Sequence, residues 1–442
     1  MKKNNFTIKT LGCKVNQSES DAICQQMKNM EWFQTLLDEK ARICIINTCT
    51  VTQKASMQSR QAIRKAIKSN PKACIIVTGC YAQTEPDEIK KIEGVDYIVG
   101  NTDKHNIPEI ITPSANNVCS KFKQPVSICK DISKQQIFKQ MPLSISSNKT
   151  RPVLKIQDGC NSFCTYCIVP FARGKSRSMT MEKVIENIAQ LDKSGFNEVV
   201  LSGVHLGRYG YDLSPNTSLT KLLYHIHKYR IIKRIRLSSI EPLELVDTII
   251  DLVAKTDIFC NHFHIPLQSG DDTILKKMGR PYTSKQFKDL ILKINQKIPD
   301  AAIGIDVLSG FPGETLSSFN KTLSFIKEIK VSYLHVFPFS PRKNTHAYNL
   351  PDKIDPQIIK KRCRQIRILG NSKKKKFYNK FVNKQVKILI ESKTDKQTGF
   401  LKGITSNYIP VMVAGDDSKK NCFVNAKINK VEDINLVFGT IV

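Results

Sequence analysis

The chain has 442 residues, 40% of them hydrophobic, which is enough for two to four domains with buried cores. A formal charge of +30 predicts a polyanionic partner, most simply a nucleic acid, although the codon usage of an AT-rich genome also enriches lysine. No apolar run approaches the ~18 residues of a membrane span, and no apolar segment follows the first lysines, so we expect a soluble cytoplasmic protein with no membrane partner. In a reducing compartment, its fourteen cysteines favour metal binding or catalysis over disulfides.

Residues 1–104 alternate strand and helix patterns. Residues with helical periodicity follow each of the apolar runs FTIKTLGC, ARICIINTC and ACIIVTGC. This order predicts an α/β domain with a parallel sheet and helices packed on it. Residues 105–150 lack periodicity and are rich in Ser, Lys, Gln and Pro, so we expect a long connection, at least partly disordered, in which Cys119 and Cys129 are plain thiols.

Strand and helix patterns resume over residues 151–372. Six β-rich runs, separated mostly by helical patterns, predict a complete or partial α/β barrel. A strongly basic helical segment spans residues 355–384 and could carry phosphate contacts, although most such runs are solvated faces. Residues 373–442 are expected to form the last domain, in which five short strands from residue 385 predict a small β-barrel of a kind that many nucleic-acid modules use.

The stretch DGCNSFCTYCIVP holds three cysteines with the spacing C-x3-C-x2-C at the end of the first predicted barrel strand. These residues, Cys160, Cys164 and Cys167, are called the loop trio below. A structural zinc site is closed by four ligands, but the next cysteine, Cys260, is far away in the sequence. Three thiolates can hold three irons of a [4Fe–4S] cluster and leave the fourth iron open to a substrate. The alternatives are a zinc loop or three unrelated cysteines.

The three N-terminal apolar runs end in Cys13, Cys49 and Cys80, called the sheet trio below. Because the carboxyl ends of parallel strands lie along one edge of a sheet, we expect these thiols to converge. Gly12 and Gly79 precede two of them and allow close backbone approach. The pattern predicts a second three-ligand cluster site, with small buried hydrophobes as the alternative. Three further cysteines, at strand starts or on a helix, are expected to pack in the core: Cys24, Cys44 and Cys74.

Two such trios, an α/β barrel and a C-terminal β-barrel together resemble the radical S-adenosylmethionine (SAM) methylthiotransferase family over nearly the whole chain. LGCKVNQSESD and INTCTVT are similar to the family's first domain, the loop trio with its neighbours matches the radical-SAM signature, and GITSNYIPVMV resembles a TRAM domain, an RNA-binding module. Similar later blocks are LSGVHLGRYG, RLSSIEP, HIPLQSGDD, LKKMGRPYT, GFPGET and HVFPFSPRKNTHA. KVNQ after Cys13 and FPFSPRKNT look most like the MtaB-type tRNA enzymes. Met179 departs from the pattern, which has arginine there.

The resemblance implies that a methylthio group is added to carbon 2 of N6-threonylcarbamoyladenosine at position 37 of tRNA. It assigns the loop trio to a [4Fe–4S] cluster that cleaves SAM and the sheet trio to an auxiliary [4Fe–4S] cluster that carries the sulfur, while a second SAM supplies the methyl group. The implied partners are SAM, the tRNA anticodon stem-loop and a reducing electron donor of the flavodoxin or ferredoxin class. Carbon 2 bears an unactivated C–H, so a radical is needed, and the cofactors supply this chemistry.

Candidate SAM contacts lie near the loop trio and at the ends of barrel strands. Tyr166 could pack on the adenine, and Gly203 allows backbone approach to the SAM amino group. Ser238 and Glu241 could bond the methionine moiety or the ribose. The run from Gly304 through Gly310 to Glu314 could hold the adenine through backbone groups. Ordinary barrel-rim structure is the alternative for each of them.

Other polar residues have weaker motif support. His262 and His264 share one face of a strand, where satisfied core histidines are the commoner explanation. The phosphates of the anticodon loop could be bound by the C-terminal barrel and by Arg173, Lys175 and Arg177. Aromatic side chains could stack on the bases of this loop.

Three rival functions stay open. The first keeps the chemistry but modifies isopentenyladenosine tRNA or an aspartate of a ribosomal protein, and the residues after Cys13 disfavour it by resemblance alone. The second is a non-enzymatic RNA-binding protein with structural zinc, which would be colourless, whereas a cluster protein is brown and sensitive to air. The third is a redox-sensing cluster protein, which would release no 5′-deoxyadenosine from SAM.

Overall fold

The computed structural model describes residues 4–36, 39–111, 124–145 and 149–442. The chain divides into two compact units. The first consists of Met1–Ser146, Val153–Met179 and Ser340–Tyr348, and the second of Ser147–Pro152, Thr180–Phe339 and Asn349–Val442. Both cysteine trios therefore belong to the first unit. Among the described helices, none has the length and apolar character that crossing a membrane requires.

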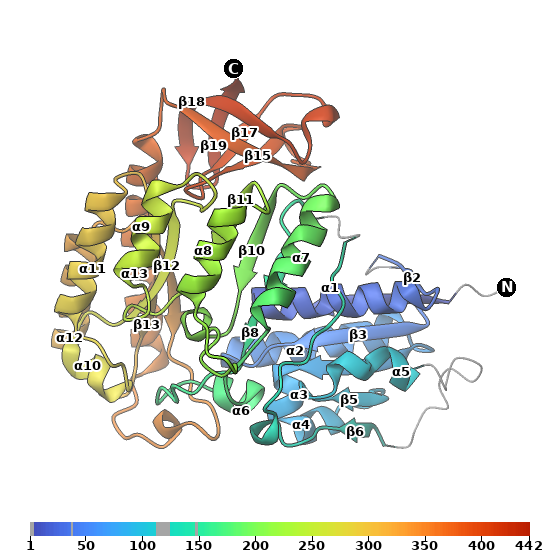
Figure 1. The fold of residues 1–442 in the computed structure, drawn as a ribbon. Coiled ribbons are helices and arrows are strands. Elements are labelled where there is room, and N and C mark those ends of the chain that lie inside the picture. Colours follow the sequence, from blue (N-terminus) through green and yellow to red (C-terminus); the bar gives the residue numbers. More distant parts are fainter. Residues whose placement is uncertain (1–3, 37–38, 112–123, 146–148) are drawn as a thin grey trace. The chain divides into compact units, whose positions relative to one another are not determined.

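A six-stranded sheet forms the centre of the first unit (Figure 1). Its strand order is β2-β1-β3-β4-β5-β6, and every neighbouring pair is parallel. The strands are β1 (Asn5–Thr10), β2 (Phe33–Gln34), β3 (Ile43–Thr48), β4 (Cys74–Gly79), β5 (Tyr97–Val99) and β6 (Val126–Ile128). The predicted N-terminal parallel sheet is confirmed.

Helices cover both faces of this sheet. Ile43 and Ile45 of β3 pack in the cluster that includes α1 and α5, whereas Cys44 and Ile46 pack in the cluster on the opposite face with α2. Burial on both faces explains why β3 and β4 are continuous apolar runs rather than alternating ones. The helices are α1 (Lys14–Asn29), α2 (Gln53–Ser69), α3 (Cys80–Thr84), α4 (Pro86–Lys90) and α5 (Ile107–Ile111).

The expected long connection over residues 105–150 is partly wrong, because this segment supplies α5 and strand β6. The Gly100 N–H donates to the Ile128 carbonyl at 2.8 Å, which joins β6 to the sheet. Three residues are too few to show a period, so the pattern could not reveal this strand. Cys129 is a free, half-buried thiol whose S–H points to the Ala82 carbonyl at 3.6 Å, and Cys119 lies outside the described residues.

The rest of the first unit carries the loop trio. Its elements are β7 (Val153–Lys155), β8 (Gln157–Asp158), α6 (Val169–Arg173), β9 (Arg177–Ser178) and a 3-10 turn at His346–Tyr348. Strands β8 and β9 pair antiparallel, so the cysteine loop between them leaves and returns at one place.

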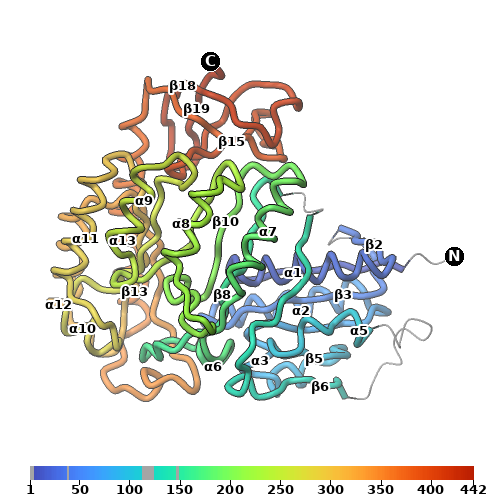
Figure 2. Tube along the Cα trace, in the orientation of Figure 1, coloured from blue at the N-terminus to red at the C-terminus, as the bar shows by residue number. Residues whose placement is uncertain are grey.

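The second unit begins with alternating helices and parallel strands (Figure 2). Strands β10 and β11 pair in parallel, as do β12, β13 and β14, and within the described residues a single bridge, Ile235 to Phe259, extends the β11 edge. The predicted α/β region is therefore confirmed in its open, partial form. Its strands are β10 (Glu198–Ser202), β11 (Arg234–Leu237), β12 (His262–Gln268), β13 (Ala302–Ser309) and β14 (Tyr333–Pro338). Its helices are α7 (Met181–Lys193), α8 (Leu219–Tyr229), α9 (Asp247–Lys255), α10 (Asp272–Lys277), α11 (Ser284–Lys297) and α12 (Leu316–Glu328).

The predicted basic helix and five-stranded barrel are also confirmed. Helix α13 (Pro356–Asn379) leads into a closed barrel with the strand order β15-β16-β17-β19-β18. Phe377, Tyr378 and Phe381 join the apolar core of the barrel, so the end of α13 is part of this domain. The strands are β15 (Gln385–Thr394), β16 (Leu401–Thr405), β17 (Pro410–Val413), β18 (Phe423–Asp433) and β19 (Leu436–Ile441).

Candidate functional site

The sheet trio converges as predicted. Cys13, Cys49 and Cys80 follow β1, β3 and β4, which are neighbours in the sheet, so the three cysteines lie along one edge. A Cβ atom on Gly12 would lie 2.9 Å from the Cys49 sulfur, which shows how closely the Cys13 loop approaches Cys49. Glycine is therefore required at this position, both for space and for its φ of +97°.

The surroundings of two of these thiols raise their pKa. Burial is the main cause that raises the pKa of Cys49 to about 12, and the nearby cysteines act in the same direction. Dense protein surroundings also raise the pKa of Cys13, although its side chain keeps contact with solvent. Such thiols become thiolates when a metal replaces the proton, so the site suits a bound metal better than a free nucleophile.

Buried polar residues hold the backbone around the sheet trio. The Ser59 hydroxyl accepts from the Cys49 N–H at 3.2 Å and donates to the Cys49 carbonyl at 2.9 Å. The Asn16 amide donates to the carbonyls of Leu11 and Thr48 at 2.8 and 3.0 Å, which ties the ends of β1 and β3 together. Sequence reasoning missed these positioning roles. Asn16 belongs to the KVNQ block, which was the available signal.

A distant segment also supports the Cys49 loop. The Arg342 guanidinium donates to the hydroxyl of Thr50 and to the carboxylate of Glu85, both at 2.6 Å. Ser340, in the same segment, accepts from the backbone N–H of Gln53 at 2.7 Å. The SPRKNT block was noted in the sequence, but nothing local indicated that its arginine contacts the N-terminal sheet.

The loop trio lies in a tightly closed loop. The Cys160 N–H donates to the Gly174 carbonyl at 3.0 Å, and the Ala347 N–H donates to the Thr165 carbonyl at 2.7 Å. A Cβ atom on Gly159 would lie 1.9 Å from the Lys175 carbonyl oxygen, so Gly159 is needed to close the loop. The three cysteines are half-buried, so part of each residue stays exposed to solvent.

Both trios suit an iron–sulfur cluster. A structural zinc site is closed by four ligands, whereas each trio supplies three cysteines. Three cysteines can hold three irons of a [4Fe–4S] cluster and leave the fourth iron without a cysteine ligand.

Replacing Gly79 with alanine should displace Cys80. The Gly79 φ is +96°, and an added Cβ would lie 2.4 Å from the Thr48 carbonyl oxygen, so we expect a loss of about 1–3 kcal/mol in stability together with lower iron content. Thermal denaturation and iron analysis measure both effects. Gly195→Ala is the matched control, because its φ is +85° but nothing lies within 4 Å of the added atom. Equal effects of the two substitutions would contradict this account.

The predicted basic contacts to tRNA are partly wrong. Arg173 and Arg177 are buried, with exposed side-chain fractions of 3% and 5%. Arg173 pairs with Glu19 and Asp158, and Arg177 donates to backbone carbonyls. Lys175 is exposed and stays available for a phosphate. Sequence spacing could not separate them, because burial depends on the sheet packed against this loop.

The candidate SAM contacts occupy separate places. Tyr166 is half-buried within the loop trio. In the second unit, Gly203 follows β10, and the buried Ser238 hydroxyl has no partner among the described residues. Glu241 pairs with Arg280, although burial raises the pKa of its carboxyl group. A buried hydroxyl without a hydrogen-bond partner is costly, so Ser238 is the candidate that a ligand would stabilise most directly. The role of each of these residues in SAM binding stays a prediction.

The two candidate glycines on β13 have structural roles. Gly304 is the third residue of this strand, and a Cβ atom there would lie 2.1 Å from the Tyr333 ring. Gly310 follows the strand with a φ of +85°, and its N–H donates to Glu314 at 2.9 Å. This backbone donor is already used, so the structure adds no support for adenine binding by either glycine.

The two histidines of β12 have different partners. His264 and His335 both contact the Asp306 carboxylate, at 2.8 and 3.3 Å, whereas His262 bonds the Tyr333 hydroxyl at 2.7 Å. Ligand atoms of His264, Asp306 and His335 lie within 4.8 Å of one another, close enough for one metal ion. The carboxylate oxygen already bonds both imidazoles, so the group is satisfied without an ion.

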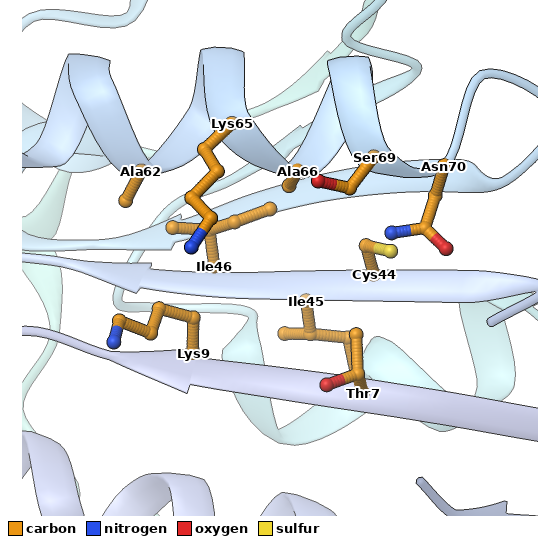
Figure 3. A pocket seen from close by; sticks show the side chains of 10 residues that line it. All are labelled: Thr7, Lys9, Cys44, Ile45, Ile46, Ala62, Lys65, Ala66, Ser69 and Asn70. Carbon is orange, nitrogen blue, oxygen red and sulfur yellow. The ribbon is translucent and has the colours of Figure 1, made fainter. Parts of the chain in front are cut away.

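A cavity of about 210 Å³ lies between α2 and the sheet (Figure 3). Ala62 and Ala66 of α2 leave space above Ile46, and Lys9 and Lys65 line one end of the cavity. None of the sheet trio lines it. The small alanine side chains of α2 explain this cavity. We assign the cavity no role in the sheet-trio site.

Comparison with known families places the two trios in two different family matches. A family model described as an uncharacterized protein family, UPF0004, matches residues 5–100, and the radical SAM superfamily model matches residues 154–326. The first match contains the sheet trio and the second contains the loop trio.

Curated relatives extend over nearly the whole chain. A threonylcarbamoyladenosine tRNA methylthiotransferase, MtaB, of Bacillus subtilis is 39% identical over 95% of this chain and 93% of its own. MtaB of Aquifex aeolicus is 35% identical over 92% and 96%. A tRNA-2-methylthio-N(6)-dimethylallyladenosine synthase of Clostridium tetani is 33% identical over 98% and 96%.

A solved structure shares the fold. It is the radical S-adenosylmethionine methyltransferase TsrM from Kitasatospora setae, which superposes with a TM-score of 0.58 at 13% identity, over 78% of this chain and 77% of that one.

Proposed function

Because this chain belongs to the radical SAM methylthiotransferases, we propose that it adds a methylthio group to carbon 2 of N6-threonylcarbamoyladenosine at position 37 of tRNA. The convergence of the sheet trio in the same compact unit as the loop trio carries the proposal, because this chemistry needs two open cluster sites. The MtaB relatives support this substrate, since their identities of 39% and 35% exceed the 33% of the dimethylallyladenosine enzyme.

The two trios would hold two [4Fe–4S] clusters. Once bound, the clusters and SAM supply a radical that can remove the hydrogen of carbon 2 and the sulfur that replaces it. The protein's own part is positioning. Gly159 and the Ala347–Thr165 hydrogen bond hold the loop trio, while Ser59, Asn16 and Arg342 hold the strand ends that carry the sheet trio.

Several partners belong to this proposal. We assign SAM binding to Tyr166, Gly203, Ser238 and Glu241. The RNA would meet Lys175, the exposed lysines of α13 and the C-terminal barrel, where positive charge and aromatic rings occur together, as in Lys387 over Phe423. The electron donor would be a flavodoxin or ferredoxin, and the place of action the cytoplasm.

Mass spectrometry of tRNA nucleosides tests the proposal. In cells without this gene, the methylthio form of threonylcarbamoyladenosine should disappear, and the wild-type gene should restore it. Genes with Cys13→Ala or Cys160→Ala should not restore it, because each removes a ligand from one trio.

Other results would redirect the proposal. Loss of the methylthio form of dimethylallyladenosine would keep the chemistry and replace the substrate. An unchanged nucleoside profile, in cells that also lack related enzymes, would exclude tRNA and point to a ribosomal protein.

A further inference from the structure

Two exposed aromatic residues, Phe163 and Phe171, flank the loop trio and are called the ring pair below. Phe163 lies between Cys160 and Cys164, and Phe171 lies on α6 (Figure 1), four residues after Cys167. The two residues are 60% and 38% exposed. Their ring centroids lie 6.0 Å apart at an interplanar angle of 85°, which is an edge-to-face pair. An apolar pair therefore meets solvent at the loop that would hold the SAM-cleaving cluster.

The backbone holds the ring pair in place. Phe163 has a φ of 44°, in the left-handed region that a bulky side chain rarely adopts. Such a conformation costs free energy, and residues of this kind cluster at binding and active sites. The Phe171 N–H donates to the Ile168 carbonyl at 3.1 Å, which fixes the second residue in the first turn of α6. The exposure of both rings thus belongs to the folded loop.

One exposed cation accompanies the ring pair. Residues 159–178 contain no carboxylate side chain, and two of their three cations, Arg173 and Arg177, are buried. The third, Lys175, is exposed. Its carbonyl accepts from the Arg177 guanidinium at 2.6 Å and closely approaches Gly159, so Lys175 is held beside the cysteine loop. An anion that reaches this segment meets a cation and no opposing carboxylate of the same segment.

Two rings and a cation suit single-stranded RNA better than a protein partner. Unstacked bases stack on aromatic side chains whatever their identity, while lysine contacts the phosphates. A stable protein interface needs about 800 Å² from each partner. An aromatic side chain buries about 150–250 Å², so the ring pair offers too little for such an interface but enough for one or two bases. Because the rings are nearly perpendicular, two bases that diverge can cover both, whereas one continuous base stack cannot.

We propose that Phe163 and Phe171 are the stacking surface for the bases that flank position 37 of the tRNA, with Lys175 on a neighbouring phosphate. This inference rests on the proposed function, because base 37 must come close to the loop trio and its neighbours must then pass over this loop. Stacking holds these neighbours without reading which base each one is. The enzyme therefore accepts different bases on either side of position 37.

The experiment measures how tightly the cluster-loaded full chain binds a synthetic anticodon stem-loop with threonylcarbamoyladenosine at position 37. Phe163→Leu and Phe171→Leu remove a ring but keep apolar bulk, and each should raise the Kd from fluorescence anisotropy about 5- to 50-fold. Phe163→Trp keeps a ring and should bind as tightly as wild type. Lys175→Gln should weaken binding whatever the flanking bases and lower the slope of the salt dependence by about one.

The chain supplies a matched control. Phe33 of the edge strand β2 is also 60% exposed and belongs to the same unit, so Phe33→Leu should leave the Kd unchanged. Stem-loops with an abasic residue on either side of position 37 should bind wild type more weakly, yet add little to the loss in the variant that lacks the matching ring. Iron analysis shows whether each variant keeps its clusters. If Phe163→Leu loses iron, Phe171→Leu decides, because Phe171 lies outside the cysteine segment.

The remaining outcomes would overturn the proposal. Wild-type affinity in Phe171→Leu, or an equal loss of affinity in Phe33→Leu, would remove the stacking role, and methylthiolation by the wild type would then leave the proposed function standing. Unchanged RNA binding with slower reduction of the clusters by flavodoxin would assign the ring pair to the electron donor instead. If the wild type binds no stem-loop, whatever the modification at position 37, and forms no methylthio nucleoside, the proposed function fails and this inference fails with it.

Discussion

The protein with Cys49 replaced by alanine should still release 5′-deoxyadenosine from SAM under a strong reductant, yet form methylthio nucleoside about 100-fold more slowly or not at all. The loop trio, which we assign to SAM cleavage, keeps its own closed loop and shares no ligand with the sheet trio. Iron content should fall by roughly half, because one of two clusters is lost. Liquid chromatography of both products and iron analysis of the purified protein measure these effects.

The same strand supplies the control. Cys44 is the second residue of β3 and is 1% exposed, whereas Cys49 directly follows the end of this strand. Cys44→Ala should keep both products and the full iron content, because this thiol packs in the core between α2 and the sheet. Cys164→Ala should lose both products. Retained methylthiolation in Cys49→Ala would contradict the assignment of the sheet trio.

Loss of the Glu198 charge should destabilise the second unit by about 3–5 kcal/mol, because it leaves two buried guanidinium groups without their carboxylate. Glu198 of β10 bonds Arg236 at 2.8 Å and also pairs with Arg234, and all three side chains are at most 5% exposed. Arg236 also donates to the carbonyls of Thr405 and Ser406 at 3.0 and 2.9 Å. The network therefore connects the parallel strands to the C-terminal barrel.

Stability should depend on pH for the same reason. Burial alone would raise the pKa of Glu198, but Arg236 and Arg234 hold it at about 2, below its ordinary 4.5. A depressed pKa contributes stability above the unfolded value and loses it as the pH falls from about 4.5 to 2. The contribution is about 3 kcal/mol, so the pH dependence of unfolding over this window should weaken in Glu198→Gln.

Thermal unfolding and limited proteolysis measure this effect. Glu198→Gln should unfold at lower temperature near neutral pH and release the barrel to a protease sooner than wild type. Asp251→Asn is the control, since its pair with Lys297 is exposed and is worth no more than about 1 kcal/mol. Wild-type behaviour of Glu198→Gln would show that other contacts hold the barrel.

Patterns along the chain were sufficient for the main elements and for the positions of both cysteine trios at the ends of strands. Strands β1, β3 and β4 are long or apolar enough to be recognised, and a parallel sheet has only one carboxyl edge, so the convergence of Cys13, Cys49 and Cys80 could be predicted. The closed barrel was predictable from short strands that alternate with turns. Strand β6 was not, because three residues in a polar segment carry no period.

The sequence by itself determined where the cysteines lie, because each ends a strand or closes a local loop, and local patterns report local structure. The tertiary structure alone decided how the charges pair. Arg173 and Arg177 look like surface residues in the sequence but are buried, and Arg342 supports Thr50 from 292 positions away. Burial and ion pairing depend on which elements pack together. The residues next to an arginine in the sequence therefore do not indicate whether it is buried or which carboxylate it pairs with.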